Sequence, residues 1–234
     1  NNTVGGMTAD DGNTIAFNGG DGVFVQNIGA SVATGNAILS NSIHSNTGLG
    51  IDLNPNGVNL NDLGDADTGA NNRQNFPVLT AAIYLAGSTI VEGTLNSTPN
   101  QTFTVQFFAN LAADPTGFGE GQTFVGAATV TTDVNGNVSF ATTLTTAVAE
   151  GDVITATATD PGNNTSEFSL AATVTVFDVV IDASTTQAFL DSLVNVGGSI
   201  LVIGVGRADL VLPNLATVGG DIRVIGNGAL SLFD

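Results

Sequence analysis

The chain has 234 residues, of which 21 are acidic and three are basic, so its formal net charge is −18; it contains no cysteine. An acidic surface of this kind repels nucleic-acid phosphates, which excludes nucleic acid as a partner. Without cysteine, disulfides, thiolate catalysis and cysteine metal sites are excluded as well. No apolar run approaches the roughly 18 residues of a membrane span, so we expect no membrane insertion within this sequence.

Residues 1–78 contain a repeated pattern. "NTIAFNGGDGVFV" (13–25) and "NSIHSNTGLGIDL" (41–53) align at a constant offset of 28 residues (41 − 13), and "NNTVGG" (1–6) resembles "GNAILS" (35–40). The pairs that this alignment matches are Val4 with Ile38, Ile15 with Ile43, and Asn18 with Asn46. Short strand-like runs with turns between them, repeated at this spacing, predict stacked coils of a right-handed parallel β-helix with asparagine ladders. We expect about two end coils and then an acidic linker.

Residues 79–177 show a different pattern, with seven strand-like runs separated by turn signals such as "DVNGN" (133–137) and "DPGNN" (160–164). The predicted strands are 79–85, 88–96, 101–110, 122–132, 137–145, 152–159 and 166–176. Seven strands in about 100 residues, linked mostly as hairpins, predict an antiparallel immunoglobulin-like sandwich. We expect the 13 phenylalanines of the chain to belong to its cores.

Residues 178–234 repeat again. "LVNVGGSILVIG" (193–204) aligns with "LATVGGDIRVIG" (215–226) at an offset of 22, and "ADLVLPN" (208–214) resembles "GALSLFD" (228–234) at an offset of 20. Leucines and Val-Gly-Gly at fixed places predict a partial leucine-rich-like solenoid. Before the repeats, residues 184–193 predict one short helix with Ser184 or Thr185 as its N-cap. The predicted fold class is therefore all-β, in three parts.

These residues resemble known families. "GNAILSNSIHSNTGLGIDLNPNGVNLNDLGDADTGANNRQNFPVL" (35–79) resembles the closing coils of β-helix repeats in large secreted bacterial surface proteins, and "ITATATDPGNNTSEFS" (154–169) is similar to the immunoglobulin-like module that follows them. "LPNLATVGGDIRVIGN" (212–227) resembles the L domain of cell-surface receptors. The resemblance implies an exported, multidomain, cell-surface or adhesin-like bacterial protein, and it implies no catalytic residues.

The stretch "NPNGVNLNDLGDADTGANN" (54–72) contains a candidate metal site. Its candidate ligands are Asp62, Asp65, Asp67 and Asn71. Calcium takes six to eight oxygen ligands, and this spacing lets side chains of one loop converge on one ion. The alternative is a solvated acidic linker held by turns, since the full EF-hand pattern is absent. The Asn-Gly of residues 133–137 indicates a hairpin turn instead, and Glu167 has no predicted role.

Catalysis finds little support in the sequence. Asp10 and Asp11 are adjacent acids in a loop, whereas paired carboxylates that act on glycans need a defined separation. His44 is predicted to be an outward side chain on a strand, and the coils contain no basic residue to abstract a proton. We therefore expect no catalytic residues, and no enzyme.

The predicted function is a non-catalytic structural or adhesive segment of a secreted or cell-surface protein. Its partners would be an extracellular glycan or a surface protein, and its location extracellular or at the cell surface. The alternative is a carbohydrate-binding or carbohydrate-cleaving β-helix, which the absence of tryptophan and the single tyrosine weaken.

Overall fold

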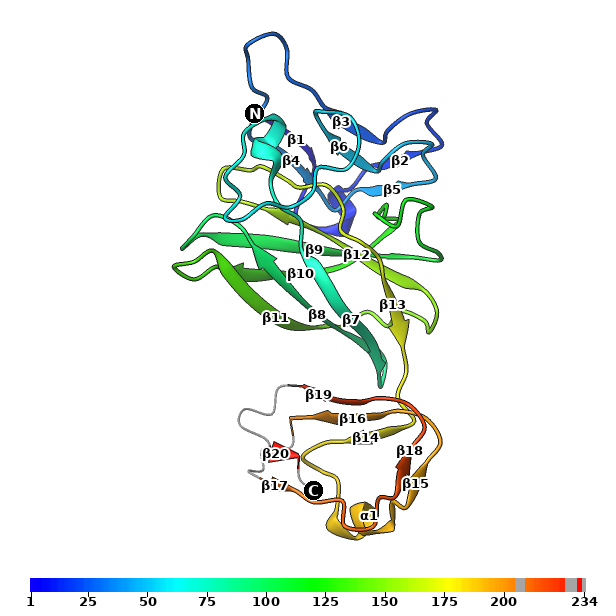
Figure 1. Cartoon of the computed structure of the whole chain (residues 1–234). Helices are drawn as coiled ribbons and strands as arrows, with labels where there is room; N and C mark the ends of the chain where they lie inside the picture. The colour runs from blue at the N-terminus through cyan, green and yellow to red at the C-terminus, as the bar shows by residue number, and fades with distance from the viewer. Residues whose placement is uncertain (205–208, 226–230, 233–234) are drawn as a thin grey trace. The chain divides into compact units, whose positions relative to one another are not determined.

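A computed structural model describes residues 1–204, 209–225 and 231–232 of the chain. It consists mostly of β-strands, which confirms the all-β prediction (Figure 1). The chain divides into two compact units, Asn1–Thr175 and Val176–Asp234, and the first contains both of the first two predicted segments. No helix of the described residues is long and apolar enough to cross a membrane.

Six short strands in the first unit form three parallel pairs. The strands are β1 (Asn2–Gly5), β2 (Thr14–Ala16), β3 (Val23–Val25), β4 (Asn36–Leu39), β5 (Ser42–His44) and β6 (Ile51–Leu53). β1 pairs with β4, β2 with β5 and β3 with β6. Ile15 lies opposite Ile43 and Val4 opposite Ile38, which confirms the predicted matches. We call β1–β3 the first repeat and β4–β6 the second repeat.

Asparagine columns hold the two repeats in register. Asn13 donates from its backbone N and its Nδ2 to Oδ1 of Asn41, at 3.0 and 2.9 Å. Asn18 makes the same pair of bonds to Oδ1 of Asn46, at 3.2 and 2.8 Å. The two asparagines of the second repeat also donate back to backbone carbonyls of the first repeat, Asn41 to Val4 and Asn46 to Ile15. A change of register would break these bonds, so the repeated asparagines fix the alignment.

A shared apolar core lies between the repeats and the strands that follow. The buried members are Val25, Ile38, Ile43, Ile51, Leu53, Ala70, Phe108 and Phe168. Not every phenylalanine is in a core, however: Phe17 is 81% exposed, and its φ of 61° turns the chain outward just after β2. Phe24 and Phe189 are also exposed, at 42% and 44%, so the prediction that the phenylalanines are core residues is wrong at these three positions.

The following seven strands form one curled sheet. They are β7 (Val78–Leu85), β8 (Ser88–Asn96), β9 (Thr102–Asn110), β10 (Thr123–Thr131), β11 (Asn137–Leu144), β12 (Val153–Thr159) and β13 (Ala172–Thr175). Their order is β10-β9-β12-β13-β7-β8-β11, in which β13 is antiparallel to β12 and parallel to β7. The end strands β10 and β11 contact each other, so the sheet nearly closes around its core. The last predicted strand, 166–176, is too long, because β13 covers only Ala172–Thr175. Before it, Ser166 and Ser169 donate to carbonyls of β12, and Glu167 accepts from Leu53 N of the second repeat.

Two strands of this sheet are buried on both faces. All seven residues of β12 are buried, and in β9 Phe107 points into the sheet's own core while Phe108 joins the core under the repeats. On the second face β9 and β12 carry Gln106, Thr155 and Thr157, all of which are buried. Alternating strands usually expose one polar face to water, but here the repeats cover it.

The second unit contains short parallel strands and one helix. Its elements are β14 (Val179–Ile181), α1 (Gln187–Ser192), β15 (Asn195–Val196), β16 (Ile200–Ile203), β17 (Asp209–Leu210), β18 (Thr217–Val218), β19 (Ile222–Ile225) and β20 (Ser231–Leu232). β15 pairs with β18 and β16 with β19 at the predicted offset of 22.

Two predictions for the second unit are wrong in detail. β17 pairs with β20 through Asp209 and Ser231, an offset of 22 (231 − 209) in place of the 20 that the sequence similarity suggests, although part of that similarity lies outside the described residues. A shift of two residues keeps side chains on the same faces, so the pattern does not reveal it. The N-cap of α1 is Thr186, whose hydroxyl accepts from Phe189 N at 3.3 Å.

The burial difference between the repeats gives a first prediction. Ile43 is 1% exposed whereas its partner Ile15 is half-buried. Replacing a fully buried isoleucine by alanine costs about 2–5 kcal/mol, so we expect Ile43→Ala to lower the stability of the first unit clearly more than Ile15→Ala. Chemical denaturation of both variants measures this. Equal losses would contradict the burial described above.

Candidate functional site

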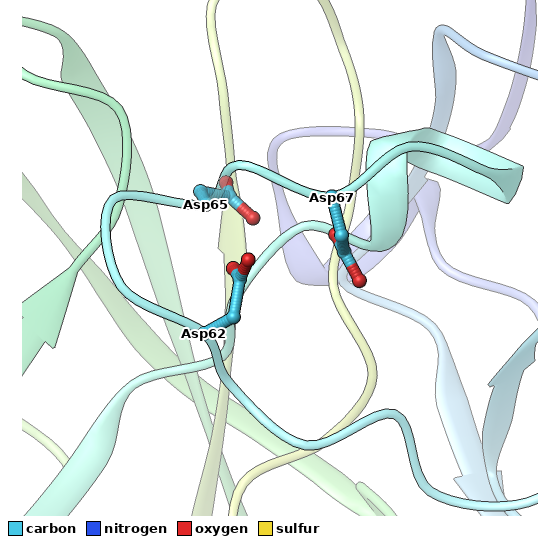
Figure 2. Close-up of side chains that lie close together, drawn as sticks. All are labelled: Asp62, Asp65 and Asp67. Carbon is cyan, nitrogen blue, oxygen red and sulfur yellow. The ribbon is translucent and has the colours of Figure 1, made fainter.

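The first candidate site is the acidic triad, which we define as Asp62, Asp65 and Asp67. Each contributes one carboxylate oxygen, and these oxygens lie within 4.8 Å of one another. Figure 2 shows the three side chains gathered around one space between the two arms of the loop. The structure thus brings together three of the four predicted calcium ligands.

Hydrogen bonds tie the triad to the end of β8. Asp65 accepts from Asn75 N at 3.1 Å and from the Ser97 hydroxyl at 2.6 Å, so both its oxygens have donors. Asp62 accepts from Ala66 N at 3.2 Å with either oxygen. The Asn75 amide crosses the loop and donates to the carbonyl of Asp62 at 2.7 Å. The loop is therefore a braced structure joined to the seven-stranded sheet.

The triad concentrates negative charge at a half-buried place. Burial raises the pKa of Asp65 to about 6, the Ser97 and Asn75 hydrogen bonds oppose this, and the charges of Asp62 and Asp67 add to it. Burial also raises the pKa of Asp67, against the effect of Arg73. A carboxylate of raised pKa beside two others gains from any cation placed between them.

The Arg73 side chain and the second oxygen of Asp67 decide how a cation would fit. Arg73 Nη1 lies 3.4 Å from Oδ2 of Asp67, which supplies one positive charge at the edge of the triad. Oδ1 of Asp67 is shielded from solvent and accepts no hydrogen bond from the described residues. Hard oxygen donors of this type suit calcium, so the donor set fits such an ion, with Arg73 as its competitor.

Asn71 serves another purpose. It is fully buried, and its Oδ1 accepts from the backbone N and the Nδ2 of Asn36, at 3.0 and 3.1 Å. Its own Nδ2 donates to the carbonyls of Asn36 and Thr165. Asn2 donates in turn to Oδ1 of Asn36 at 2.7 Å. Asn71 is therefore the third member of an asparagine column, with its amide engaged there.

The second candidate site is the junction between the second repeat and the seven-stranded sheet. Glu120, 9% exposed, lies here. Its Oε1 accepts from the backbone N and the Nδ2 of Asn46 at 2.9 and 2.8 Å, and its Oε2 accepts from Ser45 N. Asn46 receives the same two kinds of bond from Asn18, so the Glu120 carboxylate occupies the place that the next asparagine of the column would have.

Glu167 performs a similar role under β6. It is 3% exposed and accepts from Leu53 N at 2.9 Å, from Asn59 N at 2.9 Å and from Asn59 Nδ2 at 2.7 Å. Burial, the largest cause, raises its pKa to about 6, and the charge of nearby Asp52 adds to this. Asp52 is fully buried, and its Oδ2 accepts from Gly57 N at 2.9 Å.

Further side chains of the sheet complete the junction under β4. Asn164 Oδ1 accepts from Gly35 N at 2.6 Å, and Thr165 Oγ1 accepts from Ile38 N at 2.9 Å. Gln106 Oε1 accepts from Ser40 N at 2.9 Å. At β5, Ile43 and Gly121 exchange two backbone bonds, of 2.8 and 2.7 Å. We call the edge of the second repeat that faces away from the first repeat its lower edge. The seven-stranded sheet and its loops thus supply acceptors along this lower edge. Sequence reasoning missed this role, because only the repeats carry a periodic signal.

Two of the three residues considered for catalysis, Asp11 and His44, have structural partners. Asp11 accepts from the backbone N and the hydroxyl of Thr8, at 3.2 and 2.9 Å, and Asp10 lies exposed beside it. His44 is half-buried on β5, with Nδ1 3.1 Å from the Ser45 hydroxyl and its ring edge-on to Phe17. A cavity of about 460 Å³ adjoins His44, Glu120 and Asp114. Both oxygens of Glu120 are already engaged, so it has no free carboxylate to offer the cavity.

Comparison with known proteins gives no family assignment, since the chain matches no protein-family model and no curated protein.

The raised pKa of Glu167 predicts a pH effect. Between its ordinary value of 4.5 and about 6, the folded chain binds a proton that the unfolded chain releases. Stability from this group is therefore complete below pH 4.5 and is lost as the pH rises through 6, a change on the order of 2 kcal/mol. Denaturation at pH 4.5 and pH 7, with a chelator present, measures it. Asp65, whose pKa is also raised to about 6, contributes to the same difference. Glu167→Gln should therefore reduce the difference without abolishing it, and an unchanged pH slope in this variant would contradict the assignment.

Proposed function

We propose that the chain is a non-catalytic structural or adhesive segment of a secreted or cell-surface multidomain bacterial protein. In this proposal the two repeats, with residues 1–78, are end coils of a parallel β-helix, residues 79–177 are an immunoglobulin-like module, and residues 178–234 are a partial L-domain-like solenoid. The three parallel strand pairs, the seven-strand order and the 22-residue pairing support these three assignments.

The observation that carries the proposal is the Glu120 bond set. A parallel stack must end with unpaired backbone groups, which are a liability for aggregation unless they are covered. Here two buried carboxylates, Glu120 and Glu167, accept hydrogen bonds from backbone N–H groups at the end of the stack and so cover it. In this proposal the seven-stranded module acts as a cap that is joined rigidly to the coils. Rigid joining suits a stalk or scaffold.

The alternative, a carbohydrate-active β-helix, has the cavity at His44 as its best location. Its lining includes the amides of Asn110 and Gln122, which suit sugar hydroxyls. Asn110 is engaged, however, donating to Glu120 O and accepting from Gln122 N. In this alternative the cavity would bind a glycan, but its geometry does not favour cleavage of the glycan.

Removing the cap tests the main proposal. Glu120→Ala leaves three N–H donors without acceptors, and each buried unsatisfied donor costs about 1–3 kcal/mol. We expect faster amide exchange in β5 and at Ser45 and Asn46 directly after it, and a lower stability of the first unit, whereas exposed Glu150→Ala should change neither. Amide hydrogen exchange by mass spectrometry reports on both regions. If amide exchange in the Glu120 variant is as slow as in the parent chain, the capping role proposed for the seven-stranded module is wrong.

The same preparations address catalysis. Incubation with pectins, alginates and other acidic glycans should produce no shortened chains. Reproducible cleavage that disappears in Asp10→Ala or Asp11→Ala would replace the structural function by the enzymatic one.

We further propose that the acidic triad binds calcium and stiffens the loop before β7. The unpaired oxygen of Asp67 and the three converging carboxylates support this. Binding should follow mass action, with ~2.7 kcal/mol of stabilisation at a hundredfold excess over the dissociation constant. Thermal unfolding with calcium and with chelator measures the shift. It should vanish in Asp65→Asn/Asp67→Asn and persist in Asp10→Asn, and an unchanged parent midpoint would leave only a braced acidic loop.

A further inference from the structure

The two repeats differ in how well their apolar side chains are covered. Ile38, Ile43 and Ile51 of the second repeat are at most 3% exposed. Their register partners in the first repeat, Val4, Ile15 and Val23, are only half-buried. A cavity of about 300 Å³ opens beside Val4, Val23 and Val25. The apolar stack of the second repeat thus continues into the first and ends at an uncovered surface.

The asparagine side-chain groups left free at this surface are of one kind. We define the open face as the edge of β1, β2 and β3 that is turned away from the second repeat, with the exposed side chains Asn2, Asn13 and Asn18. In each case Nδ2 is bonded to the second repeat. Among the described residues, none donates to the three Oδ1 atoms. At this end the columns finish in acceptors.

We infer that the open face is a docking surface for a further parallel repeat of the same type, which supplies asparagine N and Nδ2 donors. Such a repeat would add a strand to each of β1, β2 and β3. It would give Oδ1 of Asn13 and of Asn18 the two bonds that Asn46 Oδ1 receives from Asn18. It would give Oδ1 of Asn2 the Nδ2 bond that Asn36 receives, and it would cover Val4, Ile15 and Val23. The inference rests on the strand pairs and columns, and it does not depend on a surface location or an adhesive role.

A second copy of this chain fits the open face poorly. Two open faces brought together would present acceptor-terminated columns to each other, with no matching asparagine donors. A head-to-tail copy has no free lower edge to offer, since the seven-stranded sheet covers it within the same chain. Two chains of net charge −18 also repel each other. The added repeat is therefore the fitting occupant.

The experiment adds one repeat to the full chain. β1 and β4 are 34 residues apart (36 − 2), so a copy of residues 1–34 fused before Asn1 places each added strand in the register of the existing ones. We expect the amides of the original β1–β3 to exchange more slowly, on the order of tenfold, and the thermal midpoint of the first unit to rise. In a matched control fusion, the added copies of Val4, Ile15 and Val23 are changed to serine, and both gains should be lost.

Two results would overturn the inference. The first is equal amide exchange in β1–β3 for the fusion, its serine control and the parent chain. The second is a dimer of the parent chain in sedimentation analysis that Asn18→Ala dissociates, because a second copy would then occupy the open face. Glu120→Ala acts at the opposite edge of the repeats, so a failed cap and a failed docking surface are distinguished by which strands lose protection.

Discussion

The constraint on which the rest of the first unit depends is that the lower edge of the second repeat must find hydrogen-bond acceptors. Buried backbone N–H groups without partners are costly. Glu120, Glu167 and Gln106 supply the acceptors from loops and one strand of the sheet. Because β9 and β12 also place apolar and polar side chains under the repeats, separating the two strand sets would expose both at once. The repeats and the sheet therefore form one compact unit.

The chain buries acids with little help from positive charge, since Arg73 is the only lysine or arginine among residues 1–175. Its buried and half-buried carboxylates are held by N–H and O–H donors. Buried Glu120 is held by Ser45 and Asn46, and half-buried Asp65 by Asn75 and Ser97. Such bonds favour the charged form, while burial opposes it. Burial is the larger cause for Asp65 and Glu167, whose pKa values rise to about 6. Strong negative charge is thus compatible with a tightly joined interior.

Repetition made part of this fold predictable. Ile15 and Ile43 lie opposite each other because stacking pairs equal positions of the two repeats, and an offset of 28 therefore reveals the register. Asp62, Asp65 and Asp67 converge within one loop, so local spacing was enough to group them. Asn71 was grouped with them for the same reason, yet its partner is Asn36, which lies 35 residues away. Glu167 contacts Leu53 across 114 residues, and no periodic pattern marks such a contact.

The asparagine columns have a direction, and the chemistry of Glu120 ends one of them. An asparagine side chain both accepts and donates, so Asn46 receives from Asn18 and passes its own N–H groups onward. An ionised carboxylate only accepts. Placed after Asn46, Glu120 satisfies the column and offers no donor to anything beyond it. The end of the stack is therefore set by hydrogen-bond polarity as well as by the bulk of the sheet, whereas the opposite end retains exposed asparagine acceptors to which a donor-bearing strand could bond.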